Sequence, residues 1–326
     1  MPDRDMPDRD GPDRDMPDRD MVARDMLARD VLDALGWAGD IASVRPLAGG
    51  CVADAWLVAH ADGRHVVAKT LAGAGDDLFP IEAEGLSVLR RTGGLLTPDV
   101  LAVTPRLLIL QALSPLTATG PDQTPTEPGW TPTEPDWPAF ARSVAAMHRG
   151  TEHDRSGWPR DGYLGRLRQV NTWTAGGHEF FAEHRLLRYL REPGVAATLS
   201  ADDRRALERL CDRLPDIVPP MPAVLIHGDL WSGNLLTKAD GKIAVIDPAV
   251  CYAWAEIDLS MLWCNVRPDQ SGLFFDLYQE LNPSPPGWQE RMPLLNLREL
   301  LSTLAHFGTA AAQTARLVRD TLAPFR

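Results

Sequence analysis

The sequence predicts an α+β protein of two lobes: a small N-terminal lobe built on an antiparallel sheet with one helix, and a larger, mainly helical C-terminal lobe. Three observations carry this prediction. Short apolar runs separated by turn residues fill positions 41–111, proline-rich near-repeats fill positions 114–138, and amphipathic stretches typical of helices dominate after position 137. Because so many prolines exclude a central strand or helix, we expect an exposed insertion between the lobes.

The chain accordingly divides into four parts. Residues 1–20 repeat a pentad with a proline in every copy, which forbids helix and offers nothing apolar to pack, so we expect a disordered extension. An N-terminal lobe is expected over 21–110, a hinge and the proline-rich insertion over 111–138, and a C-terminal lobe over 139–326.

Composition excludes several classes of protein. The formal net charge is −12, whereas proteins that bind nucleic acid are usually basic, so nucleic acid is not an expected partner. The four cysteines are widely spaced without a C-x-x-C pair, which argues against a disulfide framework or a zinc site. The sequence shows neither a signal peptide nor an apolar run long enough to span a membrane. We therefore expect a soluble, cytoplasmic protein that acts without a membrane.

The elements follow from local patterns. A proline-free version of the repeat predicts a helix from position 21 that Gly36 ends, and a helix is also expected over 80–91. Strands are expected at 41–47, 53–59, 64–71 and 106–110. Amphipathic stretches of the C-terminal part cover 137–149, 179–191, 202–214 and 294–317.

The most informative segment is 225–249, which reads LIHGDLWSGNLLTKADGKIAVIDPA. Asp229 and Asn234 have the D-x-x-x-x-N spacing of a kinase catalytic loop, in which the Asp meets the substrate hydroxyl and the Asn holds Mg²⁺. The central Asp-Gly pair signals a tight turn between two apolar runs, and a hairpin folded about it would place Asn234 directly opposite Asp247. An amide oxygen and a carboxylate at that spacing suit Mg²⁺ beside substrate phosphates.

Phosphoryl transfer also needs positive charge near the phosphates. Lys69 ends an apolar strand and so requires a partner, as does the phosphate-binding lysine that pairs with a helix glutamate in kinases. On the following helix Glu82 shares a face with Leu86 and Leu89, because the spacings are four and three residues. Glu82 is therefore the expected partner of Lys69, and Glu84 is the alternative.

Other residues near these motifs admit more than one interpretation. Gly49 and Gly50 could cover nucleotide phosphates with backbone N–H groups, although paired glycines also serve any tight hairpin. Trp231, beside Ser232 in the catalytic loop, could either wall an acceptor pocket or pack beneath the loop. His227 is expected to pack within the loop.

A further acidic residue is expected to support the loop from a distance. Asp258 lies near the start of a helix, where acidic side chains are favourable. We expect its carboxylate to anchor the backbone of the catalytic loop, which is a structural role.

With these motifs, the chain resembles the fructosamine kinase (ketosamine 3-kinase) family, which is part of the larger aminoglycoside phosphotransferase-like and protein-kinase-like group. The similarity runs from about residue 30 to the end, apart from the proline-rich insertion. The catalytic motif H-G-D-x-x-x-x-N is shared by many small-molecule kinases, whereas its Trp-Ser-Gly interior is more selective. The segments that carry the resemblance are His227–Asn234, Asp247–Ala249, Leu47–Cys51, Phe79–Leu86, Tyr163–Gly165, Trp173, Phe180–Leu186 and His306–Gly308.

The resemblance implies a bilobal protein-kinase-like fold, ATP bound at a hinge formed by Gln111, Ala112 and Leu113, and Mg²⁺ as the metal. It also implies phosphorylation of the 3-hydroxyl of a ketosamine, a small-molecule or protein-bound adduct of a sugar with an amine. The 3-phosphate then decomposes spontaneously and releases the amine, so the family repairs glycated amines and proteins.

The sequence departs from the family pattern D-P-A-x-Y-Y-G-x-R-E after the metal-binding acid. Cys251, Ala253 and Ala255 replace the first Tyr, the Gly and the Arg, whereas Tyr252 and Glu256 remain. This change leaves the catalytic residues intact and puts the choice of substrate in question. A related kinase for an aminoglycoside or amino alcohol, and a nucleotide-binding scaffold without catalysis, are the alternatives.

Overall fold

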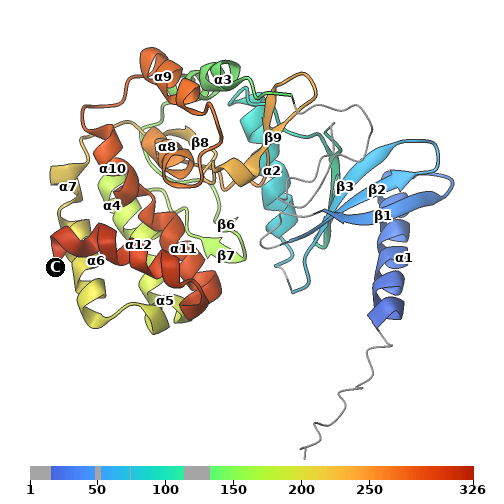
Figure 1. Ribbon diagram of the computed structural model, residues 1–326, viewed down its shortest axis with the longest axis horizontal. Helices are drawn as coiled ribbons and strands as arrows, with labels where there is room; N and C mark the ends of the chain where they lie inside the picture. The colour runs from blue at the N-terminus through green and yellow to red at the C-terminus, as the bar shows by residue number, and fades with distance from the viewer. Residues whose placement is uncertain (1–15, 48–52, 74, 114–132) are drawn as a thin grey trace, which may run out of the picture.

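The computed structural model describes residues 16–47, 53–73, 75–113 and 133–326. Figure 1 shows a sheet lobe with α1 on one side, a helical lobe on the other, and α2 between them. The α+β class and the two lobes predicted from the sequence are present. The paired glycines Gly49 and Gly50, and most of the proline-rich insertion, lie outside the described residues.

The N-terminal lobe is built on a five-stranded antiparallel sheet with the strand order β1-β2-β3-β5-β4. The sequence predicted four of these strands and missed β4, which has only four residues and alternates between half-buried and exposed side chains. The strands are β1 (Ile41–Leu47), β2 (Asp54–His60), β3 (His65–Thr70), β4 (Val100–Val103) and β5 (Leu107–Gln111).

Two helices cover the two faces of this sheet. Val31 of α1 (Met16–Leu35) packs in one cluster with Ile109 of β5, whereas Leu108 packs in a second cluster with residues of α2 (Leu78–Arg91). Because alternate residues of a strand point to opposite faces, β5 can read as a continuous apolar run and still serve both helices. The same alternation in β3 determines which of its side chains face α2.

The start of α1 corrects one expectation. Residues 1–20 were expected to lack structure, but the helix begins at Met16, inside the last pentad. Pro17 occupies its first turn, where a missing backbone N–H costs nothing because that group has no intrahelical acceptor. The helix ends at Leu35, and Gly36 follows with φ of 60°, as the sequence predicted. Residues 1–15 lie outside the described residues.

The C-terminal lobe buries most of the hydrophobic core among its helices and three two-stranded sheets, β6–β7, β8–β11 and β9–β10. The predicted stretch 294–317 covers the end of one helix, the whole of a second and the first half of a third, and the chain turns at Gly308 with φ of 54° between the last two. The helices are α3 (Trp137–Gly150), α4 (Gly177–Phe181), α5 (Pro193–Thr198), α6 (Ala201–Asp212), α7 (Leu214–Ile217), α8 (Ala255–Cys264), α9 (Gly272–Leu281), α10 (Trp288–Leu295), α11 (Leu297–Phe307) and α12 (Ala312–Leu322). The strands are β6 (Gly162–Leu164), β7 (Leu167–Gln169), β8 (Val224–Ile226), β9 (Leu235–Thr237), β10 (Ile243–Val245) and β11 (Cys251–Ala253).

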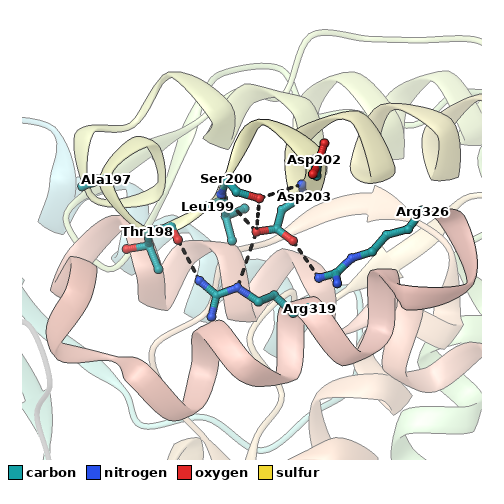
Figure 2. A pocket seen from close by; sticks show the side chains of 8 residues that line it. All are labelled: Ala197, Thr198, Leu199, Ser200, Asp202, Asp203, Arg319 and Arg326. Carbon is teal, nitrogen blue, oxygen red and sulfur yellow. Dashed lines mark hydrogen bonds and ion pairs between the residues drawn. The ribbon is translucent and has the colours of Figure 1, made fainter.

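Side-chain contacts hold the C-terminal end of the chain against α6. Ser200 and Asp203 form a capping box at the start of this helix. The buried Asp203 carboxylate also accepts from Arg319 at 3.4 Å and from Arg326 at 2.8 Å, and Figure 2 shows both guanidinium groups converging on it. The last residues therefore pack against the helical lobe.

Within the described ranges, none of the helices has both the length and the apolar character that a membrane crossing requires.

Candidate functional site

The segment that the sequence singled out forms a hairpin between β9 and β10. The Lys238 N–H donates to the Lys242 carbonyl at 2.9 Å, and the Gly241 N–H donates back to the Lys238 carbonyl at 2.9 Å. Gly241 has φ of 80°, a conformation that glycine adopts without strain. The turn is therefore a three-residue loop with glycine in the left-handed position, rather than a two-residue loop.

The odd loop length corrects the predicted register of the hairpin. Leu235 pairs with Val245, and the Ile246 N–H donates to the Asn234 carbonyl at 3.1 Å. Asn234 thus faces Ile246, and Asp247 lies one residue beyond the position directly opposite Asn234. The predicted centre of the turn lies half a residue too late, because an Asp-Gly pair alone does not distinguish a two-residue from a three-residue loop.

Asn234 holds Asp229 in place. Its side-chain nitrogen donates to the Asp229 backbone carbonyl and to the Asp229 carboxylate, both at 2.8 Å. Asn234 is only 5% exposed, so both bonds are made in a largely water-free environment. Because the amide nitrogen makes both bonds, the amide oxygen is the atom of Asn234 that suits a hard cation.

The environment of Asp229 disfavours its charged form. Burial raises the pKa of this carboxyl well above its ordinary value, and repulsion from Glu299 and Asp247 acts in the same direction. Arg298 and the hydrogen bond from Asn234 oppose the shift without cancelling it. A carboxylate with a raised pKa is a stronger base toward a hydroxyl proton than an exposed aspartate.

Asp258 of α8 anchors the catalytic loop, as the sequence predicted. Its two carboxylate oxygens accept from the backbone N–H groups of His227 and Gly228, both at 2.8 Å. His227 is fully buried and packs within the loop, again as predicted: its Nδ1 accepts from the Asp229 N–H at 3.2 Å. Nε2 therefore carries the proton and donates to the Ile246 carbonyl at 3.0 Å, while burial lowers the pKa of the ring.

Two glycines let neighbouring elements approach the Asp-Pro-Ala segment closely. Gly228 has φ of 79°, and a Cβ there would overlap the carbonyl oxygen of Ala249. Gly85 lies in α2, where a Cβ would stand 2.9 Å from Cγ of Pro248. Asp247, which directly precedes Pro248, has a left-handed backbone with φ of 55°, which is unusual for a residue other than glycine.

Lys69 of β3 points toward α2 and forms ion pairs with two acidic residues, Glu82 and Asp247. Its Nζ lies 2.7 Å from Oε1 of Glu82 and 2.6 Å from Oδ1 of Asp247. The pairing with Glu82 is the one that the helix spacing predicted, and Glu84 instead accepts from Arg160 at 2.9 Å. Burial alone would lower the pKa of Lys69, but the Asp247 and Glu82 carboxylates outweigh it and raise the pKa.

Contacts from the C-terminal lobe also fix the position of α2. Asp77, just before the helix, accepts from the Tyr163 hydroxyl at 2.7 Å and from Arg168 at 2.7 Å. The hydrogen bond from Tyr163, followed by that from Arg168, lowers the pKa of Asp77. Near the middle of the helix, Glu84 also accepts from the Trp158 indole at 3.2 Å. The lobe that carries the catalytic loop thus holds the helix that carries Glu82.

The predicted acceptor and hinge residues contact the protein backbone around them. The half-buried ring of Trp231 lies against Gly233, where a Cβ would overlap it, and the Ser232 hydroxyl donates to the Val266 carbonyl at 3.0 Å. At the hinge, Gln111 ends β5 and its amide oxygen accepts from the Asp99 N–H at 3.3 Å. Ala112 and Leu113 follow, and Leu113 is buried.

Three residues around the catalytic loop were not predicted from the sequence. Arg298 of α11 is 1% exposed, and its Nη2 donates to the Gln169 side-chain oxygen at 2.7 Å. Gln169 in turn donates to the Ala249 carbonyl at 3.1 Å. Glu299 follows on α11 and repels Asp229. The available signal was a pair of adjacent charged residues, Arg298 and Glu299, in the first turn of a helix whose sequence is mainly apolar.

The polar residues suit a cation that is shared with a ligand rather than one caged by protein. In the portion of the chain that is described, no three His, Cys, Asp or Glu side chains converge as a metal cage. Magnesium in phosphoryl-transfer sites typically uses one or two protein oxygens together with substrate phosphates and water. Asp247, whose side chain is 40% exposed, and the amide oxygen of Asn234 are donors of that type.

Comparison with known proteins finds relatives that match most of this chain. A family model described as fructosamine kinase matches residues 25–323. A protein from Oryza sativa subsp. indica named protein-ribulosamine 3-kinase, chloroplastic, is 29% identical over 293 residues, which cover 87% of this chain and 80% of the relative. A protein from Vibrio parahaemolyticus named probable ketoamine kinase is 29% identical over 280 residues, covering 83% and 89%.

A solved structure is similar over nearly the same extent. The crystal structure of a fructosamine-3-kinase candidate from Thermobifida fusca superposes with a TM-score of 0.73 at 33% identity and covers 90% of this chain and 98% of its own. The arrangement of an antiparallel sheet lobe and a helical lobe is thus that of a kinase-like fold.

Proposed function

Because this chain belongs to the fructosamine kinase family, we propose that it is an ATP-dependent kinase that phosphorylates the 3-hydroxyl of ketosamines, fructosamine or ribulosamine adducts of amines or proteins. Decomposition of the 3-phosphate would then release the amine and so complete deglycation. The observation that carries the proposal is the buried Asp229, oriented by Asn234 in a loop that Asp258 anchors.

Asp229 is the proposed catalytic residue. Asn234 fixes its carboxylate by a hydrogen bond of 2.8 Å, so the second oxygen can meet the sugar hydroxyl in one orientation. The raised pKa favours acceptance of the hydroxyl proton as the oxygen attacks the γ-phosphorus of ATP. The phosphoryl group passes to the sugar oxygen, and ADP leaves.

The opposite side of the site is proposed to hold ATP. Lys69, fixed by Glu82 and Asp247, offers positive charge to the phosphates. Asn234 and Asp247 would hold Mg²⁺, which when bound neutralises charge on the phosphates. The hinge residues Gln111, Ala112 and Leu113 are proposed to receive the nucleotide base, with Gly49 and Gly50 over the phosphates.

The acceptor is proposed to lie beside Trp231 and Ser232. We place the reaction in the cytoplasm and expect no role for nucleic acid or membranes. A related acceptor, an aminoglycoside or amino alcohol, is the alternative, since the residues after Ala249 depart from the family pattern. ADP release measured with a panel of ketosamines, aminoglycosides and amino alcohols distinguishes these classes.

The catalytic role is tested with Asp229→Asn, which keeps the size of the side chain and removes the base. Phosphate transfer to fructose-lysine should fall at least ~100-fold, because a positioned general base typically contributes that much. Asp240→Asn, an equivalent change in the exposed turn of the same hairpin, should leave the rate unchanged. Near-normal turnover of Asp229→Asn would refute the assignment.

A further inference from the structure

The chain between β3 and α2 determines how Lys69 meets Glu82. Lys69 lies near the end of β3 and Glu82 in the second turn of α2, and their side chains are 2.7 Å apart. The helix begins just after Asp77, whose backbone carbonyl accepts from the Ile81 N–H at 3.0 Å. A shift of Asp77 would therefore move the first turns of α2 and with them the Glu82 carboxylate.

The carboxylate of Asp77 is used between the lobes rather than on its own helix. An aspartate at this position ordinarily caps the helix N-terminus, but the Asp77 side chain makes no capping bond. Its Oδ1 accepts from the Tyr163 hydroxyl and its Oδ2 from Arg168, both at 2.7 Å. These two donors lie directly opposite each other on the β6–β7 hairpin, so one hairpin engages both oxygens.

Tyr163 also reaches into the core of the sheet lobe. Its half-buried ring packs with the apolar cluster beneath α2 that contains Leu78 and Phe79. A Cβ at Gly75 would stand 2.5 Å from the Tyr163 hydroxyl oxygen, so the hydroxyl lies directly against the backbone that connects β3 to α2. The Arg168 guanidinium lies over the same ring, with Cζ 4.8 Å from its centroid. Tyr163 thus contacts both the connection and the helix that follows it.

The hairpin itself is fixed to the helical lobe. The Arg166 N–H in its turn donates to Nε2 of His306 on α11 at 3.1 Å, and the Gln169 side chain donates to the Ala249 carbonyl at 3.1 Å. Figure 1 shows β6 and β7 on the side of the helical lobe that faces α2. Because Ala249 ends the Asp-Pro-Ala segment, the hairpin links the two elements that carry the acidic partners of Lys69.

We infer that Tyr163 and Arg168 are positioning residues for the phosphate side of the site: by holding Asp77 they fix α2 before ATP binds. The helix then presents Glu82 to Lys69 in the arrangement that the phosphates require. This inference rests on the proposed function. In protein kinases the lysine–glutamate pair must be in place for activity, and phosphorylation of a separate loop often controls the position of the helix. In this chain contacts within the protein fix the helix, so the pair needs neither a modification nor the nucleotide to form.

The test uses Tyr163→Phe, which removes the hydroxyl and keeps the ring. KM for ATP, and Kd for a non-hydrolysable ATP analogue measured by calorimetry, should rise about tenfold, the factor that one hydrogen bond to a charged group supplies. KM for fructose-lysine should stay unchanged, because the acceptor side does not depend on Asp77. Arg168→Gln should act in the same direction, whereas Arg168→Lys, which keeps the charge, should retain most of the affinity for ATP.

A second background shows whether Tyr163 acts through Glu82. Once Glu82→Gln has removed the charge that pairs with Lys69, adding Tyr163→Phe should cause little further rise in Kd for the analogue, as expected for residues that act through one another. A full further rise in this background would overturn the inference. A general loss of folding would instead lower the melting temperature and affect ATP and the acceptor alike.

The matched control is Arg64→Gln. Arg64 pairs with Asp62 at 2.8 Å in the turn between β2 and β3, and the two side chains are about as exposed as those of Arg168 and Asp77. This variant should change neither KM. An unchanged Kd in Tyr163→Phe, or an equal rise in Arg64→Gln, would contradict the inference and leave the kinase assignment standing. If the unaltered protein binds the analogue but phosphorylates no ketosamine, the proposed function fails, and the calorimetric comparison still decides the role of Tyr163.

Discussion

Asp229 shows how single residues set the chemistry of this site. Burial and two neighbouring carboxylates, Glu299 and Asp247, disfavour its charge, whereas Arg298 and the amide of Asn234 favour it. The balance raises its pKa. Apart from Asn234, none of these groups belongs to the D-x-x-x-x-N motif, so the motif alone does not reveal the shift.

The rate should depend on pH through Asp229. As the pH falls through its raised pKa, the carboxyl gains a proton and can no longer accept one from the sugar, so kcat/KM should decline on the acid side. Glu299→Gln removes one repelling charge while Arg298, Asn234 and Asp247 still face the group. The acid limb should therefore move to lower pH.

The measurement is a pH profile of kcat/KM with the uncharged N-acetyl derivative of 1-amino-1-deoxyfructose as the acceptor. Binding of this compound does not involve an ammonium group. Glu280→Gln, an exposed change on α9, serves as the control and should show the profile of the unaltered protein. An acid limb that stays in place in Glu299→Gln would show that Glu299 does not influence the titration of Asp229.

At the scale of elements, α2 and the hairpin show what local patterns can and cannot predict. The spacing in α2 predicted the pairing of Glu82 with Lys69, because helix periodicity and strand alternation fix which side chains face each other. The hairpin register was wrong by one residue, because loop length depends on backbone geometry at Gly241 that an Asp-Gly pair does not specify.

Packing of α2 against the Asp-Pro-Ala segment leads to a prediction for Gly85→Ala. In a helix interior this change normally stabilises by roughly 1 kcal/mol. Here the new Cβ would stand 2.9 Å from Cγ of Pro248, so α2 or the segment must shift. Because α2 carries Glu82 and the segment carries Asp247, the shift should disturb both partners of Lys69.

We expect Gly85→Ala to lower the melting temperature and to raise KM for ATP, since overpacking typically costs about 1–3 kcal/mol. Gly150→Ala, at the exposed end of α3 with no atom near the added Cβ, is the matched control and should be neutral or stabilising. A Gly85→Ala protein that is more stable and binds ATP normally would contradict this account.

At the scale of the whole molecule, the pattern of apolar and polar residues and the proline-rich segment were enough to predict two lobes. The apolar pattern reflects burial on one or two faces of each element, and the proline-rich segment marks the boundary between the lobes. The composition could not predict how the lobes meet. That contact depends on pairs such as Tyr163 with Asp77 and Lys69 with Asp247, which lie 86 and 178 residues apart. Side chains this distant in sequence come together only through the completed fold.

Truncating the chain before or after α1 tests where the folded unit begins. Removing residues 1–15 keeps Leu27 and Val31, the residues of α1 that pack on the sheet, so activity and melting temperature should stay unchanged. Removing residues 1–35 exposes that face of the sheet. Loss of two buried aliphatic side chains costs about 3–6 kcal/mol, a large share of the stability of a typical domain.

The longer truncation should therefore lose ATP binding before it loses the helical content of the C-terminal lobe, because the damage is confined to the sheet that carries Lys69. Circular dichroism and calorimetric ATP titration on both truncated proteins measure this. If the 1–35 truncation bound ATP as well as the full chain, α1 would be dispensable for the N-terminal lobe, and the packing of Leu27 and Val31 would not contribute to its stability.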